Sequence, residues 1–215
     1  MNTKVPAEVS DIIAKFCGTI VPNQKPLYVD VKPEKYSMSR FCFQNVEQKI
    51  ANDEGCIEYG WSIWIWDKVF LDAEFHAVWK SAKGNLTDVT PSELDVNKIL
   101  FLPDRKRKYY GRQLDNIRYN LSNNGLVDLI IEVSECNYLF MNHGDRAEQL
   151  NIKLSGEELE NFKALTNCKA IVLQMLNDNK SLNSKCICDS GLKFKHCCYK
   201  GICNFLLFIR KRYKI

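Results

Sequence analysis

The chain has 215 residues, of which 46% are hydrophobic and 26% are charged. This composition excludes a disordered or low-complexity chain, and the length suffices for one sizeable domain with a small appendage. The formal net charge of +4 is too modest to indicate a dedicated nucleic-acid binder, which usually carries a concentrated basic face.

The first third of the chain predicts two helices with an irregular segment between them. Apolar residues at helical spacing over 7–16 indicate a helix that ends at Gly18. Three of the six prolines fall in 21–35, so this segment is expected to be irregular or extended. A second helix is predicted to begin at Cys42 and to end near Gly55.

Short strands and then further helices are predicted after residue 60. The runs 61–66, 69–79 and 86–89 are rich in aromatic and β-branched residues, and a turn at 83–85 separates the last two. Consecutive strands with tight turns favour antiparallel pairing. Helices are expected around 113–121, 125–136 and 157–177. The predicted fold class is therefore α+β, an antiparallel sheet flanked by helices, with one domain over 1–180.

The cysteines point to a metal site near the C-terminus. The N-terminus lacks an apolar signal sequence, and the longest apolar run, 202–209, is too short to span a bilayer. A cytoplasmic protein with reduced thiols is therefore expected. Five of the ten cysteines follow residue 185, and this uneven distribution favours metal binding over a disulfide framework.

The segment 186–198 reads CICDSGLKFKHCC and supplies two close pairs of thiols around a Ser-Gly turn. Four thiolates on short loops form the tetrahedral site that zinc prefers. The spacing predicts that the Zn²⁺ ligands are Cys186, Cys188, Cys197 and Cys198. His196 is a neighbouring competitor, but the spacing favours the cysteines. Because all four positions are filled by protein ligands, the predicted zinc is structural rather than catalytic.

This segment resembles a SEC-C motif, the small zinc-binding tail also found on the bacterial preprotein translocase ATPase. The family pattern C-x-C-x-S-G-x-K-[FY]-K-x-C-[CH] is met at every specified position, and the one departure is Asp189, where glycine is common. The resemblance implies a zinc knuckle at 181–200 that docks a protein partner. Four nearby lysines (Lys185, Lys193, Lys195 and Lys200) favour an acidic partner surface, with nucleic acid as the alternative.

Two further basic stretches leave alternatives open. The run 105–108 with Arg112, and the residues 210–212, are interpreted as solvated surface, with a polyanion site as the alternative. The residues 201–215 are interpreted as a basic, apolar tail that is disordered or docked. Contact of this tail with a membrane surface or a partner is the other interpretation.

The main domain contains a candidate thiol site. His76 and Asp88 fall on neighbouring predicted strands, where cross-strand side chains approach to about 5 Å between Cβ atoms. Cys42 opens a predicted helix, whose free N–H groups and dipole favour a thiolate. The order Cys, His, Asp supplies a nucleophile, a general base and a group that orients the base. A noncatalytic interpretation is equally open, because buried cysteine and histidine are also ordinary core residues.

The arrangement resembles the transglutaminase-like and papain-like thiol folds, in which a cysteine opens a helix packed on an antiparallel sheet that carries His and then Asp or Asn. The sequences CFQN at 42–45, HAVW at 76–79 and DVTP at 88–91 carry this resemblance, which covers about residues 36–104. It implies a Cys42–His76–Asp88 triad that processes amides as a peptidase, deamidase or transamidase. The competing hypothesis is a noncatalytic adaptor that binds protein through the zinc tail and an inactive thiol-fold domain.

Overall fold

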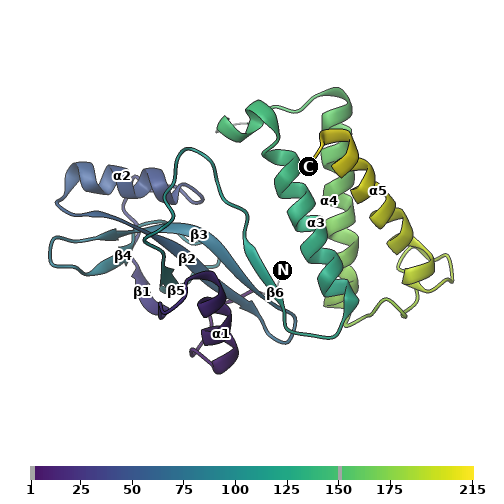
Figure 1. Cartoon of the computed structure of the whole chain (residues 1–215), viewed down its shortest axis with the longest axis horizontal. Helices are drawn as coiled ribbons and strands as arrows, with labels where there is room; N and C mark the ends of the chain where they lie inside the picture. The colour runs from purple at the N-terminus through teal and green to yellow at the C-terminus, as the bar shows by residue number, and fades with distance from the viewer. Residues whose placement is uncertain (1–2, 150–151) are drawn as a thin grey trace. The chain divides into compact units, whose positions relative to one another are not determined.

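The computed structural model describes residues 3–149 and 152–215, which form two compact units, Met1–Leu121 and Ser122–Ile215. The first unit contains the strands and two helices, and the second contains three long helices and the cysteine cluster (Figure 1). Each unit has its own buried core.

The first unit is built on a five-stranded mixed β-barrel. Its strands are β1 (Leu27–Val31), β2 (Cys56–Trp66), β3 (Phe70–Lys80), β4 (Leu86–Asp88) and β5 (Lys98–Pro103). They follow the order β2-β5-β1-β4-β3, and β3 closes the barrel by pairing with β2. The β1–β4 pair is parallel, and the other barrel pairs are antiparallel. A sixth strand, β6 (Ile117–Asn120), extends the sheet beyond β3.

Two helices pack on these strands. α1 (Asp11–Ile20) and α2 (Cys42–Asn52) place apolar residues in one large buried cluster with β2, β3 and β5, including Phe16, Val46 and Trp61. A second, smaller cluster consists of Val29, Val78, Ile99 and Phe101. Because successive residues of a strand point to opposite faces, His76 shares the Val78 face of β3, and Phe75 lies on the face toward α2.

The α+β class is confirmed, but the sheet is mixed and closed rather than antiparallel. The reason is β1, predicted only as irregular or extended, which inserts between β4 and β5 and runs parallel to β4. The helix predicted over 113–121 is wrong, because 117–120 pairs with β3 as strand β6. Gly18 lies inside α1 rather than at its end. This barrel does not establish a papain-like fold.

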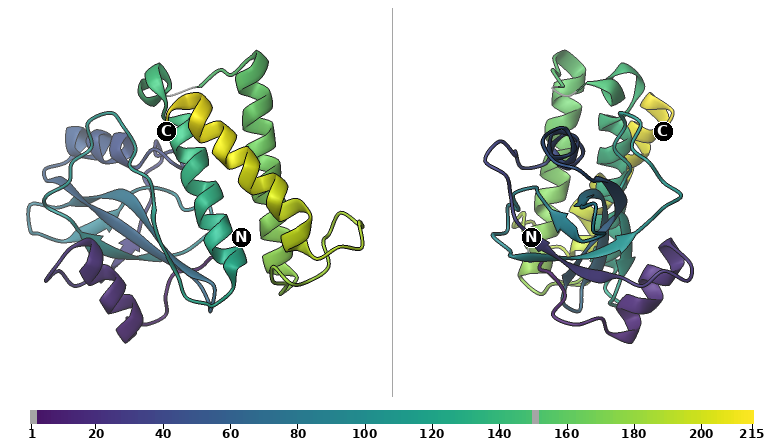
Figure 2. Two further views of the ribbon diagram at one scale, coloured as in Figure 1. Left: turned by 45° about the vertical axis from the view of Figure 1, so that its right-hand side comes forward. Right: turned by 90° about the vertical axis from the view of Figure 1, so that its left-hand side faces the viewer.

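The second unit consists of α3 (Gly125–Met141), α4 (Gly156–Asn177) and α5 (Cys198–Tyr213), which pack on one another (Figure 2). Short 3₁₀ helices at Gly144–Glu148 and Phe194–His196 precede α4 and α5. Apolar side chains spaced three or four residues apart along α5 are buried, namely Ile202, Leu206, Ile209 and Tyr213.

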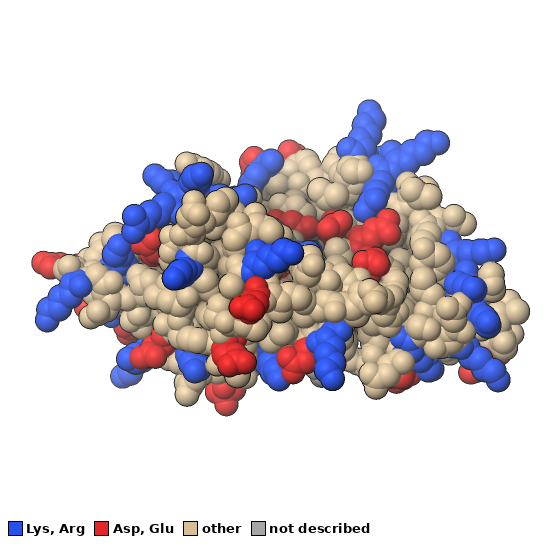
Figure 3. Space-filling model, turned by 60° about the horizontal axis from the view of Figure 1, so that its bottom comes forward, with Lys and Arg blue, Asp and Glu red and all other residues tan. Residues whose placement is uncertain are grey.

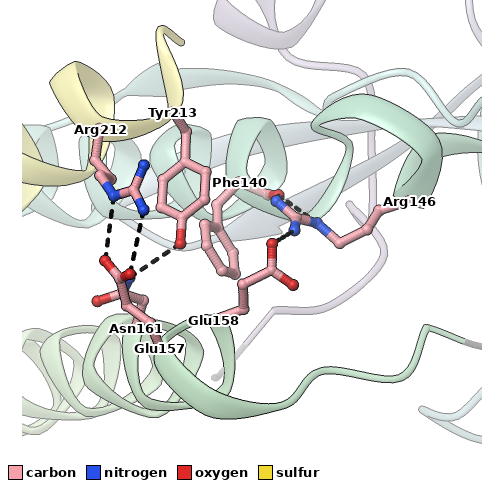
Figure 4. Close-up of polar contacts among 7 residues, drawn as sticks. All are labelled: Phe140, Arg146, Glu157, Glu158, Asn161, Arg212 and Tyr213. Atoms are coloured by element: carbon pink, nitrogen blue, oxygen red, sulfur yellow. Dashed lines mark hydrogen bonds and ion pairs between the residues drawn. The ribbon is translucent and has the colours of Figure 1, made fainter.

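The C-terminal end of α5 is held by a polar and aromatic cluster (Figure 4). Tyr213 Oη accepts a hydrogen bond of 3.0 Å from Asn161 Nδ2, and its ring meets the Phe140 ring edge-on at 4.9 Å between centroids. Arg212 donates to both carboxylate oxygens of Glu157 at 3.2 Å. Residues 201–215, predicted as a tail, thus lie mostly in a docked helix.

The predicted boundary near residue 180 also differs from this division. Helices α3 and α4, assigned from the sequence to the first domain, form the second unit with α5 because each buries apolar residues against the others.

Among the described residues, no helix is long and apolar enough to cross a membrane. On the face drawn in Figure 3, basic side chains lie among acidic ones.

Candidate functional site

His76, which is partly buried, and the buried Asp88 form a hydrogen-bonded pair on neighbouring strands. The β3–β4 register pairs Trp79 with Thr87, which places Val78 opposite Asp88 and His76 two residues further along the same face. This diagonal arrangement lets His76 Nε2 reach Asp88 Oδ2 at 2.9 Å. Asp88 is only 3% exposed, so its carboxylate is shielded from water.

Cys42 completes the cluster from the first turn of α2. Its side chain is 7% exposed and lies near enough to the His76 ring to raise the pKa of that histidine. Because Asp88 occupies Nε2, the ring nitrogen that remains for Cys42 is Nδ1. The structure thus brings together the three residues predicted from the sequence, in the order thiol, imidazole, carboxylate. Their catalytic role stays a prediction.

The charges around the imidazole favour its protonated form. Burial of the ring lowers the pKa of His76, but the negative charges of Asp88 and Cys42, and hydrogen bonds with both, outweigh this effect. The pKa of His76 therefore lies well above its usual value. A protonated imidazole beside a cysteine side chain is the arrangement that nucleophilic cysteine chemistry uses.

Two residues that the sequence analysis did not select hold this cluster in place. Thr90 donates its backbone N–H to Asp88 Oδ1 at 2.9 Å. The buried Asn45 donates to Thr90 Oγ1 and to Met38 O, and its own oxygen accepts from Met38 N. Asn45 therefore ties the segment before Cys42 to the segment after Asp88. The only sequence signal for this role is a polar residue between Phe43 and Val46 on a predicted amphipathic helix.

Three other cysteines, Cys17, Cys136 and Cys168, are buried within helices. Burial raises the pKa of Cys17 to about 11. It also raises the pKa of Cys136 and of Cys168. These three thiols are core groups, in agreement with their positions in predicted helices. Cys56, at the start of β2, is exposed and serves below as a comparison thiol.

We expect the raised pKa of His76 to appear in the pH dependence of stability. A group whose folded pKa exceeds its unfolded pKa, about 6.5 for histidine, stabilises the fold fully below that unfolded value. This stabilisation is lost as the pH rises through the folded pKa. The difference in unfolding free energy between wild type and His76→Gln, measured by urea denaturation, should therefore shrink from pH 6 to pH 9. The same comparison made in an Asp88→Asn background should show a weaker trend, and an unchanged trend would contradict this assignment.

The second site is the cysteine cluster that precedes and opens α5. The ligand sulfurs of Cys186, Cys188, Cys197 and Cys198 all lie within 4.8 Å of one another. The Cys188 sulfur is 3.3 Å from the sulfurs of Cys186 and Cys197. A tetrahedral zinc ion with Zn–S bonds of about 2.3 Å places its sulfurs about 3.8 Å apart. The four thiols therefore fit zinc in number, type and spacing, and His196 is not part of the cluster.

Local backbone geometry explains the motif. Lys185 and Lys193 form an antiparallel bridge, and Cys186 N donates to Leu192 O at 2.8 Å, so 185–193 is a hairpin-like loop. Asp189 and Gly191 both have positive φ, at 57° and 74°. Glycine adopts this conformation freely and aspartate tolerates it, which accounts for Asp189 at a position where glycine is common. Phe194, which follows the loop, is fully buried.

Comparison with known proteins supports this second site alone. Residues 183–200 match the family model of the SEC-C motif. No curated protein and no solved structure matches the chain significantly. The zinc-binding cluster therefore has a family assignment, and the β-barrel unit that carries Cys42 has none. A four-cysteine cluster within a SEC-C motif indicates a structural zinc.

Proposed function

We propose that the first unit is a cysteine-dependent acyl-transfer enzyme acting on amides, in which Cys42, His76 and Asp88 form the catalytic triad. The observation that carries this proposal is the 2.9 Å hydrogen bond between His76 and Asp88, with Cys42 near enough to the His76 ring to raise its pKa. The three residues belong to three different elements, namely Cys42 to α2, His76 to β3 and Asp88 to β4.

The reaction follows from the positions of the protons. The Cys42 thiolate attacks the amide carbonyl carbon, and a C–S bond forms. The His76 imidazolium then donates its Nδ1 proton to the leaving amine as the C–N bond breaks, which leaves a thioester on Cys42. Neutral His76 next takes a proton from water or from a second amine, which attacks the thioester and releases Cys42. Asp88, through Nε2, fixes the tautomer and orientation of the ring throughout.

The start of α2 supplies a place for the developing oxyanion. The first N–H groups of a helix have no acceptor within the helix, and Cys42 is the first residue of α2. Its own N–H can therefore donate to the tetrahedral intermediate. Gln44 follows on the same helix as a second candidate donor.

A labelling experiment tests the proposal without a known substrate. A thiolate paired with an imidazolium stays ionised at pH 6, whereas an ordinary thiol with a pKa of about 8.5 reacts about tenfold faster for each unit of pH. We expect the rate of Cys42 alkylation by iodoacetamide to be nearly flat from pH 6 to pH 8, and the rate at Cys56 to rise steeply. The slope is the decisive quantity, because it does not depend on how accessible the sulfur is. Peptide mass spectrometry measures both sites in one sample.

The matched variant is His76→Ala, which leaves Cys42 without its partner. In this variant the Cys42 profile should become as steep as that of Cys56. If Cys42 already shows the steep profile in wild type, or if His76→Ala leaves a flat profile unchanged, the triad is not a catalytic unit. Circular dichroism of the variant establishes that the fold is retained.

A second candidate function is protein docking through the zinc knuckle, with or without catalysis in the first unit. The specific observation is that Leu192 is 52% exposed on the loop between the ligand pairs and is flanked by Lys185, Lys193 and Lys195. We propose an acidic partner surface with an apolar centre. The ten unpaired thiols also support a reducing compartment such as the cytoplasm.

A further inference from the structure

The loop 105–112, called here the basic loop, concentrates positive charge, of which the first unit neutralises only a part. It carries five cationic side chains, Arg105, Lys106, Arg107, Lys108 and Arg112. Arg107 pairs with Asp104 at 2.6 Å, and Arg105 lies 3.8 Å from Glu58, which Lys80 also contacts. Lys106 and Lys108 are exposed, and no residue of the described chain forms an ion pair with either of them.

The basic loop is held at both ends by buried groups. Asp104 is 1% exposed and accepts hydrogen bonds from Trp61 Nε1, Lys106 N and Arg107. At the other end, the Tyr109 ring stacks on Phe43 at 3.9 Å with an interplanar angle of 5°. Gln113 Nε2 donates to Phe75 O at 3.2 Å. The cations are therefore presented on a fixed backbone rather than on a free tail.

Tyr110 gives the basic loop an exposed aromatic face. Its side chain is 83% exposed, although it directly follows the stacked Tyr109. Leaving a large ring in water while its neighbour is packed gains nothing for the fold. A ring between cationic residues is the combination that binds single-stranded nucleic acid, because every base has a face that can stack and every nucleotide has a phosphate.

We infer that the basic loop is a binding site for single-stranded nucleic acid, with Tyr110 stacking on a base and Lys106 and Lys108 contacting phosphates. An acidic polypeptide could form ion pairs with the lysines equally well, but its carboxylates would offer the exposed Tyr110 ring no surface on which to stack. The inference uses none of the residues Cys42, His76 and Asp88, so it does not depend on the proposed catalytic activity. The small number of free cations indicates weak binding with little base specificity.

Fluorescence anisotropy of the zinc-loaded chain with labelled oligouridine of about 12 nucleotides tests this site. Between 50 and 200 mM salt, the logarithm of the binding constant should fall against the logarithm of salt with a slope of about −1.4, as expected for two phosphate contacts on a single strand. The double variant Lys106→Glu/Lys108→Glu should bind at least about tenfold more weakly. Tyr110→Ala should bind at least about fivefold more weakly, without a change in the slope of the salt dependence.

The matched control reverses two exposed lysines elsewhere in the same unit, Lys25→Glu/Lys83→Glu. It should change the affinity by less than about twofold. An equal loss in this control would show diffuse attraction and would overturn the site. Absence of binding at 50 mM salt would overturn it too. The site would also be overturned if an oligoglutamate peptide competed as well as the oligonucleotide and Tyr110→Ala had no effect. That combined result would assign the loop to acidic polypeptides.

Discussion

Removing zinc is expected to unfold part of the second unit while leaving the first unit folded. Cys197 directly precedes α5 and Cys198 is its first residue, whereas Cys186 and Cys188 lie on the preceding loop. Without the metal, four thiols remain close together with no bond between them. Structural zinc contributes about 10–16 kcal/mol in small zinc-binding peptides, so a loss of several kcal/mol is expected here, where α5 also has apolar contacts.

The chain offers two separate optical signals for this prediction. All four tryptophans lie in the first unit, at positions 61, 64, 66 and 79, whereas the three longest helices lie in the second. Chelation, or Cys198→Ser, should lower the thermal midpoint of the helical circular dichroism signal and leave the tryptophan fluorescence midpoint unchanged. The matched control is Cys203→Ser, on α5 but outside the cluster. Equal effects of the two serine variants would contradict a structural zinc site.

Replacing Gly60 with alanine is expected to destabilise the barrel strongly. Gly60 lies on β2 opposite Pro103 of β5, and an added Cβ would lie 2.3 Å from Leu102 O and 2.5 Å from Phe101 Cζ. The carbonyl belongs to the backbone of the paired strand, so the strands themselves must move apart. We expect a loss of about 3 kcal/mol or more in the free energy of unfolding, measured by urea denaturation with tryptophan fluorescence.

Gly18 is the matched control for this substitution. It lies inside α1 with open space around the position of a Cβ. Alanine there should stabilise the first unit by up to about 1 kcal/mol, because glycine is a poor helix former. Together the two variants separate steric exclusion at the β2–β5 contact from a general effect of glycine replacement. A small effect of Gly60→Ala would mean that β2 and β5 are not paired in this register.

The features that the sequence predicted well depend on residues close together in the chain. The zinc cluster follows from four cysteines within thirteen positions, whose spacing alone fixes the geometry of the loop. Likewise, His76 and Asp88 flank one hairpin turn, so their proximity follows from local pairing. Placing Cys42 beside them required the packing of α2 on β3, and only the helix-start pattern indicated it.

The features that were missed depend on pairing between distant segments. β1 is five residues long and is framed by prolines, and its two partners begin 59 and 71 positions after Leu27, at Leu86 and Lys98. β6 alternates apolar Ile117 and Tyr119 with polar neighbours over only four residues, which periodicity cannot distinguish from a helical turn. Its strand state comes from hydrogen bonding to β3. The division at 121–122 was hidden for the same reason, since the helices of the second unit are recognisable singly but their mutual packing is not.

The most direct measurement of the proposed activity is to trap an acyl group on the protein. The reduced, zinc-loaded chain is mixed with an activated acyl ester, quenched in acid and digested for mass spectrometry. We expect a thioester on the peptide that contains Cys42, released by added amine, absent in Cys42→Ala and much reduced in His76→Ala. Acylation that is confined to Cys56, or that persists at Cys42 without His76, would contradict a Cys42–His76–Asp88 acyl-transfer site.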